Sequence, residues 1–273
     1  MLRTRVLTAM VLAPLAFLLV FQARPGQFGA IMALLLMVGA WEFRKLGGMQ
    51  KGVAGWLLLA AQGGLLLAVY QVRDALAAHA LALLTAACLL WLLMLLRLVV
   101  YRAGAVADFQ FRIVSFACAL TSLTFAWIAL YWLHSGPQGS WWILLLLLII
   151  WSADIGAYFT GRAWGRRKLA PTISPGKTVA GLAGGVVAAI AVSVAAAQFI
   201  PHIEAGLFAM TAIALITALV SVGGDLFISL HKRVTGFKDS GALFPGHGGV
   251  LDRFDSLLAG APFFALCKLA LGL

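Results

Sequence analysis

Residues 223–255 read GGDLFISLHKRVTGFKDSGALFPGHGGVLDRFD. This segment holds four of the nine acids of the chain, four basic residues and two histidines, and apolar runs flank it on both sides. A polar, glycine-rich loop between membrane helices is a place where binding or catalysis is expected. Whether this segment lies between membrane helices depends on the composition of the rest of the chain.

The composition excludes a soluble globular protein. Of 273 residues, 63% are hydrophobic and 11% are charged, and the mean hydropathy is +1.02. Repeated apolar runs of about 20 residues, the length that spans a bilayer, predict an all-α polytopic membrane protein. The three cysteines stand singly in apolar runs, which is neither a metal-binding pattern nor a disulfide framework.

We expect about nine transmembrane helices, the first of which is a retained span rather than a cleaved signal peptide. No linker isolates a soluble domain, so we divide the chain into N-terminal helices (1–134) and a C-terminal catalytic region (135–273). The segment 98–112 is too broken to span and is expected to lie at the interface. The nine predicted spans are 6–22, 28–43, 53–72, 75–96, 113–134, 141–161, 178–200, 205–230 and 254–271.

The basic residues predict the orientation. If the N-terminus is cytoplasmic, seventeen of the twenty Lys and Arg residues lie in cytoplasmic segments. Only Arg24, Arg73 and Lys268 lie outside, as the positive-inside rule requires. The polar loops 162–177 and 231–253 are then both cytoplasmic, and we expect the site at that membrane surface.

The seventh span is rich in Gly and Ala, with Gly181 and Gly185 at small-xxx-small spacing. This spacing lets helices approach closely. Packing within the chain is the main interpretation, and a homodimer contact is the alternative.

Three acids in predicted spans need an explanation, because a charged residue at mid-membrane costs about 2.5–3.5 kcal/mol. Glu42 stands next to Arg44 and Lys45, which favours an ion pair at the interface. Asp154 lies near the cytoplasmic end of the sixth span, with polar neighbours. Asp225 shares a helical face with Ser229 and Lys232.

Asp252 and Asp255 lie at the start of the last span, where the helix dipole alone favours acids. Together with Asp225 and Asp239, however, they gather carboxylates near one membrane surface. Such oxygens suit Mg²⁺ or Mn²⁺, which often share their coordination with phosphate. The basic residues nearby favour a polyphosphate ligand; they are Lys232, Arg233, Lys238 and Arg253, with Lys177 from the other loop.

Two further segments suit phosphate. The stretch PGHGG can turn tightly and expose backbone N–H groups, with Gly248 in the turn and His247 as a donor. The stretch SPGKT is expected at a helix N-terminus, where Ser174, Lys177 and Thr178 would bind an anion. It is not a P-loop, because Pro171 stands where that motif needs glycine.

The stretch from Ser229 to Asp255 closely resembles the signature of phosphatidate cytidylyltransferases (CDP-diacylglycerol synthases). The stretches WSADIGAYFTGR, GRRKLAP and SPGKT are similar to other blocks of that family, in the same order. The resemblance covers about residues 150–260 well, and the first half is similar mainly in hydropathy and in the AWEF patch.

The resemblance implies cytidylyl transfer from CTP to phosphatidate with Mg²⁺. Mn²⁺ is the other candidate ion, and the site would hold one or two cations. It implies a bacterial inner-membrane enzyme facing the cytoplasm, with no nucleic-acid partner. Asp225 and Asp252 would bind metal with Asp255 near them, and Asp239 would lie beside the substrate. The residues implied to hold phosphate are Lys232, Arg233, Lys238, Arg253, Ser174 and Lys177.

One departure from the family supports an alternative hypothesis. The family commonly has Glu before the motif serine, where this chain has Ile228. A catalytically weakened relative that binds anionic lipid is therefore one alternative. An ion-coupled transporter using Asp154 and Asp225 is another, but spans six and eight are polar only near their cytoplasmic ends.

Overall fold

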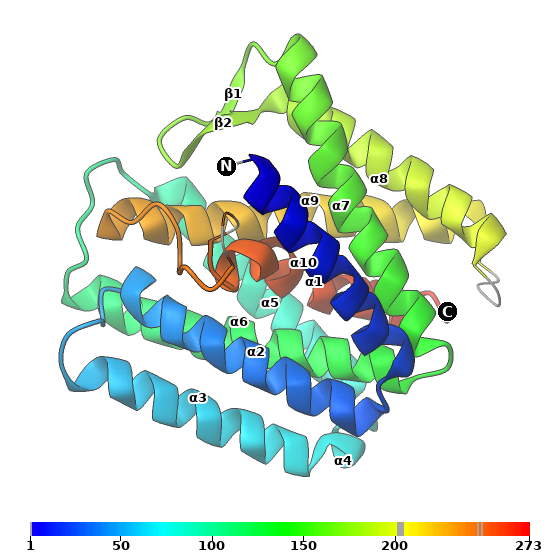
Figure 1. Cartoon of the computed structure of the whole chain (residues 1–273), viewed down its shortest axis with the longest axis horizontal. Helices are drawn as coiled ribbons and strands as arrows, with labels where there is room; N and C mark the ends of the chain where they lie inside the picture. Colours follow the sequence, from blue (N-terminus) through cyan, green and yellow to red (C-terminus); the bar gives the residue numbers. More distant parts are fainter. Residues whose placement is uncertain (1, 201–204, 245, 247) are drawn as a thin grey trace.

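The structure is a computed structural model that describes residues 2–200, 205–244, 246 and 248–273; near the N-terminus, the side chains of residues 2–9, 11 and 12 are not described. Within these residues it contains ten helices and one two-stranded sheet (Figure 1). The elements are α1 (Leu2–Gln22), α2 (Pro25–Leu46), α3 (Val53–Gln71), α4 (Arg73–Ala77), α5 (Ala80–Val100), α6 (Phe109–Ser135), α7 (Gly139–Trp164), β1 (Lys168–Ala170), β2 (Ser174–Thr178), α8 (Val179–Phe199), α9 (Leu207–Thr235) and α10 (Leu251–Ala270).

Eight of the nine predicted spans each fall mainly on one helix, and the span 75–96 falls on two, which confirms a helical architecture. Seven helices of the described chain are long and apolar enough to cross a membrane: α2, α3, α5, α6, α7, α8 and α9. The last predicted span, α10, is not among them, because Asp252, Arg253, Asp255 and Lys268 interrupt its apolar sequence. The count of nine membrane crossings therefore stays a prediction.

One sequence expectation was wrong in detail, and two others need a closer description. The predicted span 75–96 is divided, since α4 ends at Ala77 and α5 begins at Ala80. The segment 98–112 is interrupted, as predicted: α5 ends at Val100 and α6 begins only at Phe109, where the Asp108 carboxylate caps the helix by accepting from Phe111 N at 2.7 Å. Its place at the membrane interface stays a prediction. The fold class is helical, as predicted, and the loop after α7 adds one short β-hairpin, β1 and β2.

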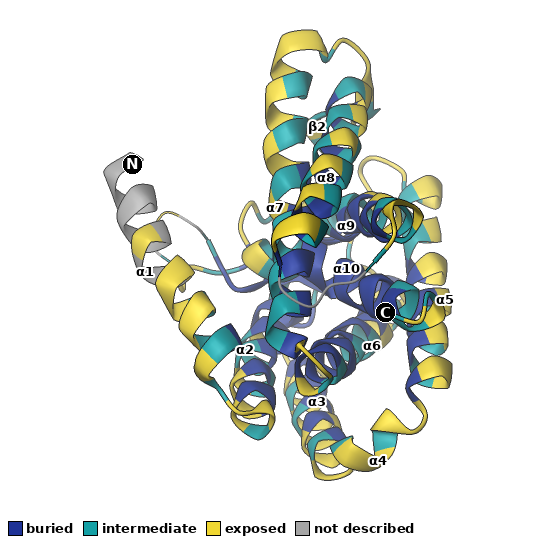
Figure 2. Ribbon diagram, turned by 90° about the vertical axis from the view of Figure 1, so that its right-hand side faces the viewer, coloured by how far each residue is buried: buried dark blue, intermediate teal, exposed yellow. Residues whose placement is uncertain are grey.

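The core is built around α6, which packs against α2, α3, α5, α7 and α10. Two side-chain hydrogen bonds connect α6 to its neighbours. Trp127 Nε1 donates to Gly29 O in α2 at 2.8 Å, and Gln62 Nε2 donates to Thr124 Oγ1 at 3.1 Å. The outward faces of α3, α5 and α7 are largely exposed and apolar (Figure 2), as expected where lipid contacts a membrane protein.

Helices α7 and α8 form a close pair that packs on α9 and projects beyond the rest of the bundle at one end (Figure 2). A Cβ on Gly181 would lie 2.9 Å from Ala157 O of α7, and one on Gly185 would lie 2.6 Å from Ala153 O. Both glycines are therefore needed for contact within the chain. The packing interpretation of this small-residue pattern is confirmed, and these two positions give no support to a dimer contact.

The polar loops lie together at one end of the bundle. The β-hairpin, the end of α2 and the end of α9 are near one another in Figure 1, while α4 and the C-terminus lie at the other end. Arg233 Nε of α9 donates to Ile173 O in the hairpin loop at 2.9 Å, which ties the hairpin to α9. This arrangement brings the two predicted cytoplasmic loops onto one surface.

Candidate functional site

The last turns of α9 carry the first set of site residues. Asp225, Ser229 and Lys232 follow one another at helical spacing and so share a face. Ser229 Oγ donates to Asp225 Oδ1 at 3.1 Å. The helix ends at Thr235, and Gly236 adopts the left-handed conformation with φ 75°, which is a common helix C-terminus.

The start of α10 lies directly against this face of α9. A Cβ on Gly224 would lie 2.5 Å from Asp255 O and 2.9 Å from Ala259 Cβ, closer than atoms of an undisturbed structure approach. Glycine before Asp225 therefore lets α10 come close at this point. As a result Asp255 lies where the charges of Asp225, Lys177 and Lys232 all act on it.

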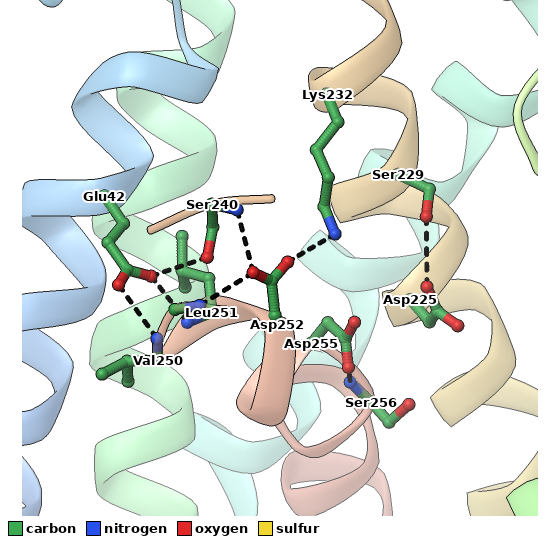
Figure 3. Close-up of polar contacts among 11 residues, drawn as sticks. Glu42, Asp225, Ser229, Lys232, Ser240, Val250, Leu251, Asp252, Asp255 and Ser256 are labelled. Carbon is green, nitrogen blue, oxygen red and sulfur yellow. Dashed lines mark hydrogen bonds and ion pairs between the residues drawn. The ribbon is translucent and has the colours of Figure 1, made fainter. Parts of the chain in front are cut away.

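Asp252 is the most constrained carboxylate of the site (Figure 3). Its Oδ1 lies 2.5 Å from Lys232 Nζ, and its Oδ2 accepts from Ser240 N and Gly249 N, both at 2.9 Å. Burial by itself would raise the pKa of Asp252, but the bonds from Lys232, Gly249 and Ser240 outweigh it and the pKa lies below its ordinary value. Asp252 is therefore ionised at neutral pH.

The hairpin contributes Lys177, whose Nζ lies 2.6 Å from Asp225 Oδ2. We call Asp225, Asp252, Asp255, Lys177 and Lys232 the carboxylate–lysine cluster. It joins β2, α9 and α10, although its members lie up to 78 positions apart in the sequence. Asp154 of α7 is exposed and lies close enough for the charges of Asp225, Lys177 and Arg253 to act on it.

Several predicted site residues have structural contacts instead. Thr178 is 5% exposed, and its hydroxyl accepts from Gly181 N at 3.0 Å as the N-cap of α8. The stretch SPGKT runs directly into α8, which begins at Val179, but Ser174 lies four residues before the N-cap, in β2. Anion binding by this stretch stays a prediction. Arg233 is bound to the hairpin loop through Ile173 O.

The remaining predicted residues lie at the edge of the site. Lys238 and Asp239 are exposed in the loop after α9, and neither takes part in the network of Figure 3. Gly248 has φ 80° and lies against the Asp252 carboxylate, where a Cβ would collide with it. His247 lies outside the described residues.

Sequence reasoning assigned Glu42 to an interface ion pair, and the structure corrects this. Glu42 is 3% exposed and accepts hydrogen bonds from Ser240 Oγ, Val250 N and Leu251 N. The neighbouring Arg44 instead stacks on the Trp41 ring, 3.8 Å from its centroid. An acid so close to Arg and Lys in sequence has an obvious local partner, so its real partners, about 200 positions away, were missed.

The donor chemistry of the cluster fits a hard divalent cation. No group of three or more His, Cys, Asp or Glu side chains close enough to hold one ion occurs among the described residues. Mg²⁺, however, is commonly held by one or two carboxylates, with water and substrate phosphates completing its shell. The Asp225 and Asp252 carboxylates provide such oxygens, and each already carries a lysine ammonium beside it.

Ile228 is fully buried in the hydrophobic core, three positions after Asp225. The residue that departs from the common family pattern is thus accommodated by apolar packing.

The comparisons with known proteins show the family of the chain. The model of the cytidylyltransferase family matches residues 3–270, and the chain belongs to this family. The phosphatidate cytidylyltransferase of Pseudomonas aeruginosa is 37% identical over 272 residues, covering 100% of this chain and 98% of the relative. That of Haemophilus influenzae is 33% identical over 285 residues, with 97% and 98% covered. That of Brucella suis is 47% identical over 130 residues, 48% of this chain and 47% of its own.

Proposed function

We propose that this protein transfers the cytidylyl group of CTP to phosphatidate, producing CDP-diacylglycerol and pyrophosphate. The observation that carries the proposal is the carboxylate–lysine cluster, in which two lysine–aspartate pairs from three elements meet at the polar end of a membrane-embedded bundle. Full-length relatives with the name phosphatidate cytidylyltransferase support it. A transporter is not favoured, because the polar side chains of α7 and α9 concentrate near one end.

The reaction requires little covalent chemistry from the protein. A phosphate oxygen of phosphatidate attacks the α-phosphorus of CTP, the bond from that phosphorus to the bridging oxygen breaks, and pyrophosphate leaves. The nucleophile is already anionic, so no strong general base is needed. Catalysis then depends on positioning the two phosphates and neutralising their charge.

The lysines of the cluster are suited to this task. Lys177 and Lys232 lie within 2.6 Å of carboxylates. We propose that on substrate binding both ammonium groups exchange these partners for phosphate oxygens, with Arg253 and Lys238 contributing charge from the rim. Ser229 holds Asp225 in place through its hydrogen bond. The oxygens of Asp225 and Asp252 would hold Mg²⁺, or Mn²⁺, which supplies Lewis-acid stabilisation of phosphate charge.

We further propose nine membrane crossings with the N-terminus in the cytoplasm, which puts the cluster at the cytoplasmic surface of the bacterial inner membrane. Phosphatidate would enter sideways from the inner leaflet, and CTP from the cytosol. The excess of basic residues in alternate loops supports this orientation. A homodimer stays a prediction.

The test uses the purified full-length chain in lipid nanodiscs that contain phosphatidate, with CTP labelled at the α-phosphorus. We expect label in CDP-diacylglycerol and release of one pyrophosphate per lipid product. Chelation with EDTA should stop turnover, and added Mg²⁺ should restore it. Phosphatidate binding without any CTP-dependent product would instead identify a silent, lipid-binding relative and refute the proposed activity.

A further inference from the structure

Glu42 links a distant helix to the loop that carries the site. Residues 240–250, called loop 240–250, form the last part of the connection from α9 to α10. Glu42 of α2 is hydrogen-bonded to both ends of this loop (Figure 3). Ser240 Oγ donates to Oε2 at 2.7 Å, while Val250 N and Leu251 N donate to Oε1 and Oε2 at 2.9 Å. One buried carboxylate thus ties Ser240 at one end of this loop to Val250 and Leu251 at the other end.

The loop is fitted to this carboxylate. A Cβ on Gly241 or on Gly249 would collide with the Glu42 oxygens. Burying a carboxylate is costly unless hydrogen bonds compensate it, and here N–H groups of the first turn of α10 do so. Glycine at these two positions and Glu42 in α2 therefore depend on one another.

The same loop residues also orient Asp252. Ser240 donates through its hydroxyl to Glu42 and through its N–H to Asp252 Oδ2. Gly249 N donates to Asp252 Oδ2, and the next two N–H groups donate to Glu42. With Oδ2 occupied by the loop, Asp252 directs Oδ1 at Lys232.

We infer that Glu42 is a positioning residue of the cytidylyl-transfer site: it holds the two ends of loop 240–250, and Ser240 and Gly249 at these ends hold the Asp252 carboxylate. This inference rests on the proposed function for its kinetic part. Glu42 contacts the loop and not the cluster, so its substitution should act on catalysis only through Asp252. A displacement of about 1 Å in a catalytic group can lower a rate by about 10²-fold.

The experiment compares Glu42→Gln with Ser240→Ala and with the double variant, all in the full-length chain in nanodiscs. Glutamine keeps the shape but turns an NH₂ group toward a loop donor. We expect kcat to fall about 10–100-fold with the KM for phosphatidate unchanged. Ser240→Ala should have a smaller effect, and the double variant should lose no more than Glu42→Gln, because both act through one loop.

The second readout is independent of activity. Hydrogen exchange of the peptide covering residues 238–253 should speed up in Glu42→Gln, while peptides from α6 should not change. The matched control is Gln62→Leu, which removes another buried hydrogen bond between helices, to Thr124. The control should lower the melting temperature and leave kcat within about twofold.

The possible outcomes test the positioning role of Glu42 separately from the proposed cytidylyl transfer. If Glu42→Gln lowers only the melting temperature, as the control does, with unchanged kcat and loop exchange, Glu42 is merely structural and the inference is overturned. If Glu42→Gln does not fold, Ser240→Ala decides, because its loop exchange and kcat must change together. If the wild-type chain forms no CDP-diacylglycerol, the proposed function fails, while hydrogen exchange still tests whether Glu42 orders the loop.

Discussion

Lys177 Nζ of the β-hairpin lies 2.6 Å from Asp225 Oδ2 of α9. Lys232 of α9 makes a second such pair with Asp252 of α10, with Nζ 2.5 Å from Oδ1. Both lysines that we expect to bind phosphate are thus held by the two carboxylates that we expect to bind metal. The pairs keep four charged side chains oriented at the polar end of the bundle, and each pair has groups of both signs that could bind a triphosphate and its cation.

Lys177→Met should weaken the binding of CTP. Loss of a charged hydrogen-bond donor costs about 1.5–3 kcal/mol, so the KM for CTP should rise about 10–100-fold. Lys168→Met is the matched control, because Lys168 lies exposed in the same hairpin. Steady-state kinetics at varied CTP would measure the difference, and equal KM values for the two variants would contradict a role for Lys177 in binding the nucleotide.

Asp252→Asn should abolish turnover while the protein stays folded. The amide oxygen can still accept from Ser240 N and Gly249 N, but the charge beside Lys232 and the proposed metal ligand are lost. We expect a fall in kcat of at least about 10²–10³-fold. Asp108→Asn serves as control, since asparagine also caps a helix well. Near-normal CDP-diacylglycerol formation by Asp252→Asn would refute the metal assignment.

Gly224→Ala should disturb the contact between α9 and α10 at the site. The added methyl would meet Asp255 O at 2.5 Å, so one helix has to move. Overpacking of this kind costs about 1–3 kcal/mol, and activity should fall together with the melting temperature. Gly64→Ala in α3 meets nothing within 4 Å and should be neutral or slightly stabilising. An active, fully stable Gly224→Ala would show that the close approach is not required.

The orientation is testable by labelling single cysteines in intact bacterial cells. The exposed positions Lys168, in the hairpin, and Pro137, between α6 and α7, lie at opposite ends of α7. With Cys267 replaced by serine, a maleimide that does not cross membranes should label Pro137→Cys and not Lys168→Cys. Permeabilised cells should show both labels. The reverse pattern would require the N-terminus to lie outside.

Much of this protein was predictable from local sequence. Apolar runs of bilayer length determine where helices form, because every backbone polar group inside a membrane must be satisfied within its own helix. The motif from Ser229 to Asp255 indicated the family, and the match to residues 3–270 confirms it. The lysines and acids of the carboxylate–lysine cluster were also found, since charges are rare in such a chain and therefore conspicuous.

Other features depend on contacts between distant segments. Nothing local to Glu42 shows that it accepts hydrogen bonds from Ser240 and Leu251, because those donors approach only when α2 packs beside the start of α10. The pairing of Lys177 with Asp225 likewise depends on the hairpin that separates Ser174 from the helix. Sequence alone therefore determined the helices, the family and the charged residues from which the cluster is built. Tertiary structure decided which charges face one another, because a charge takes as its partner whatever the packed helices bring within a few ångströms.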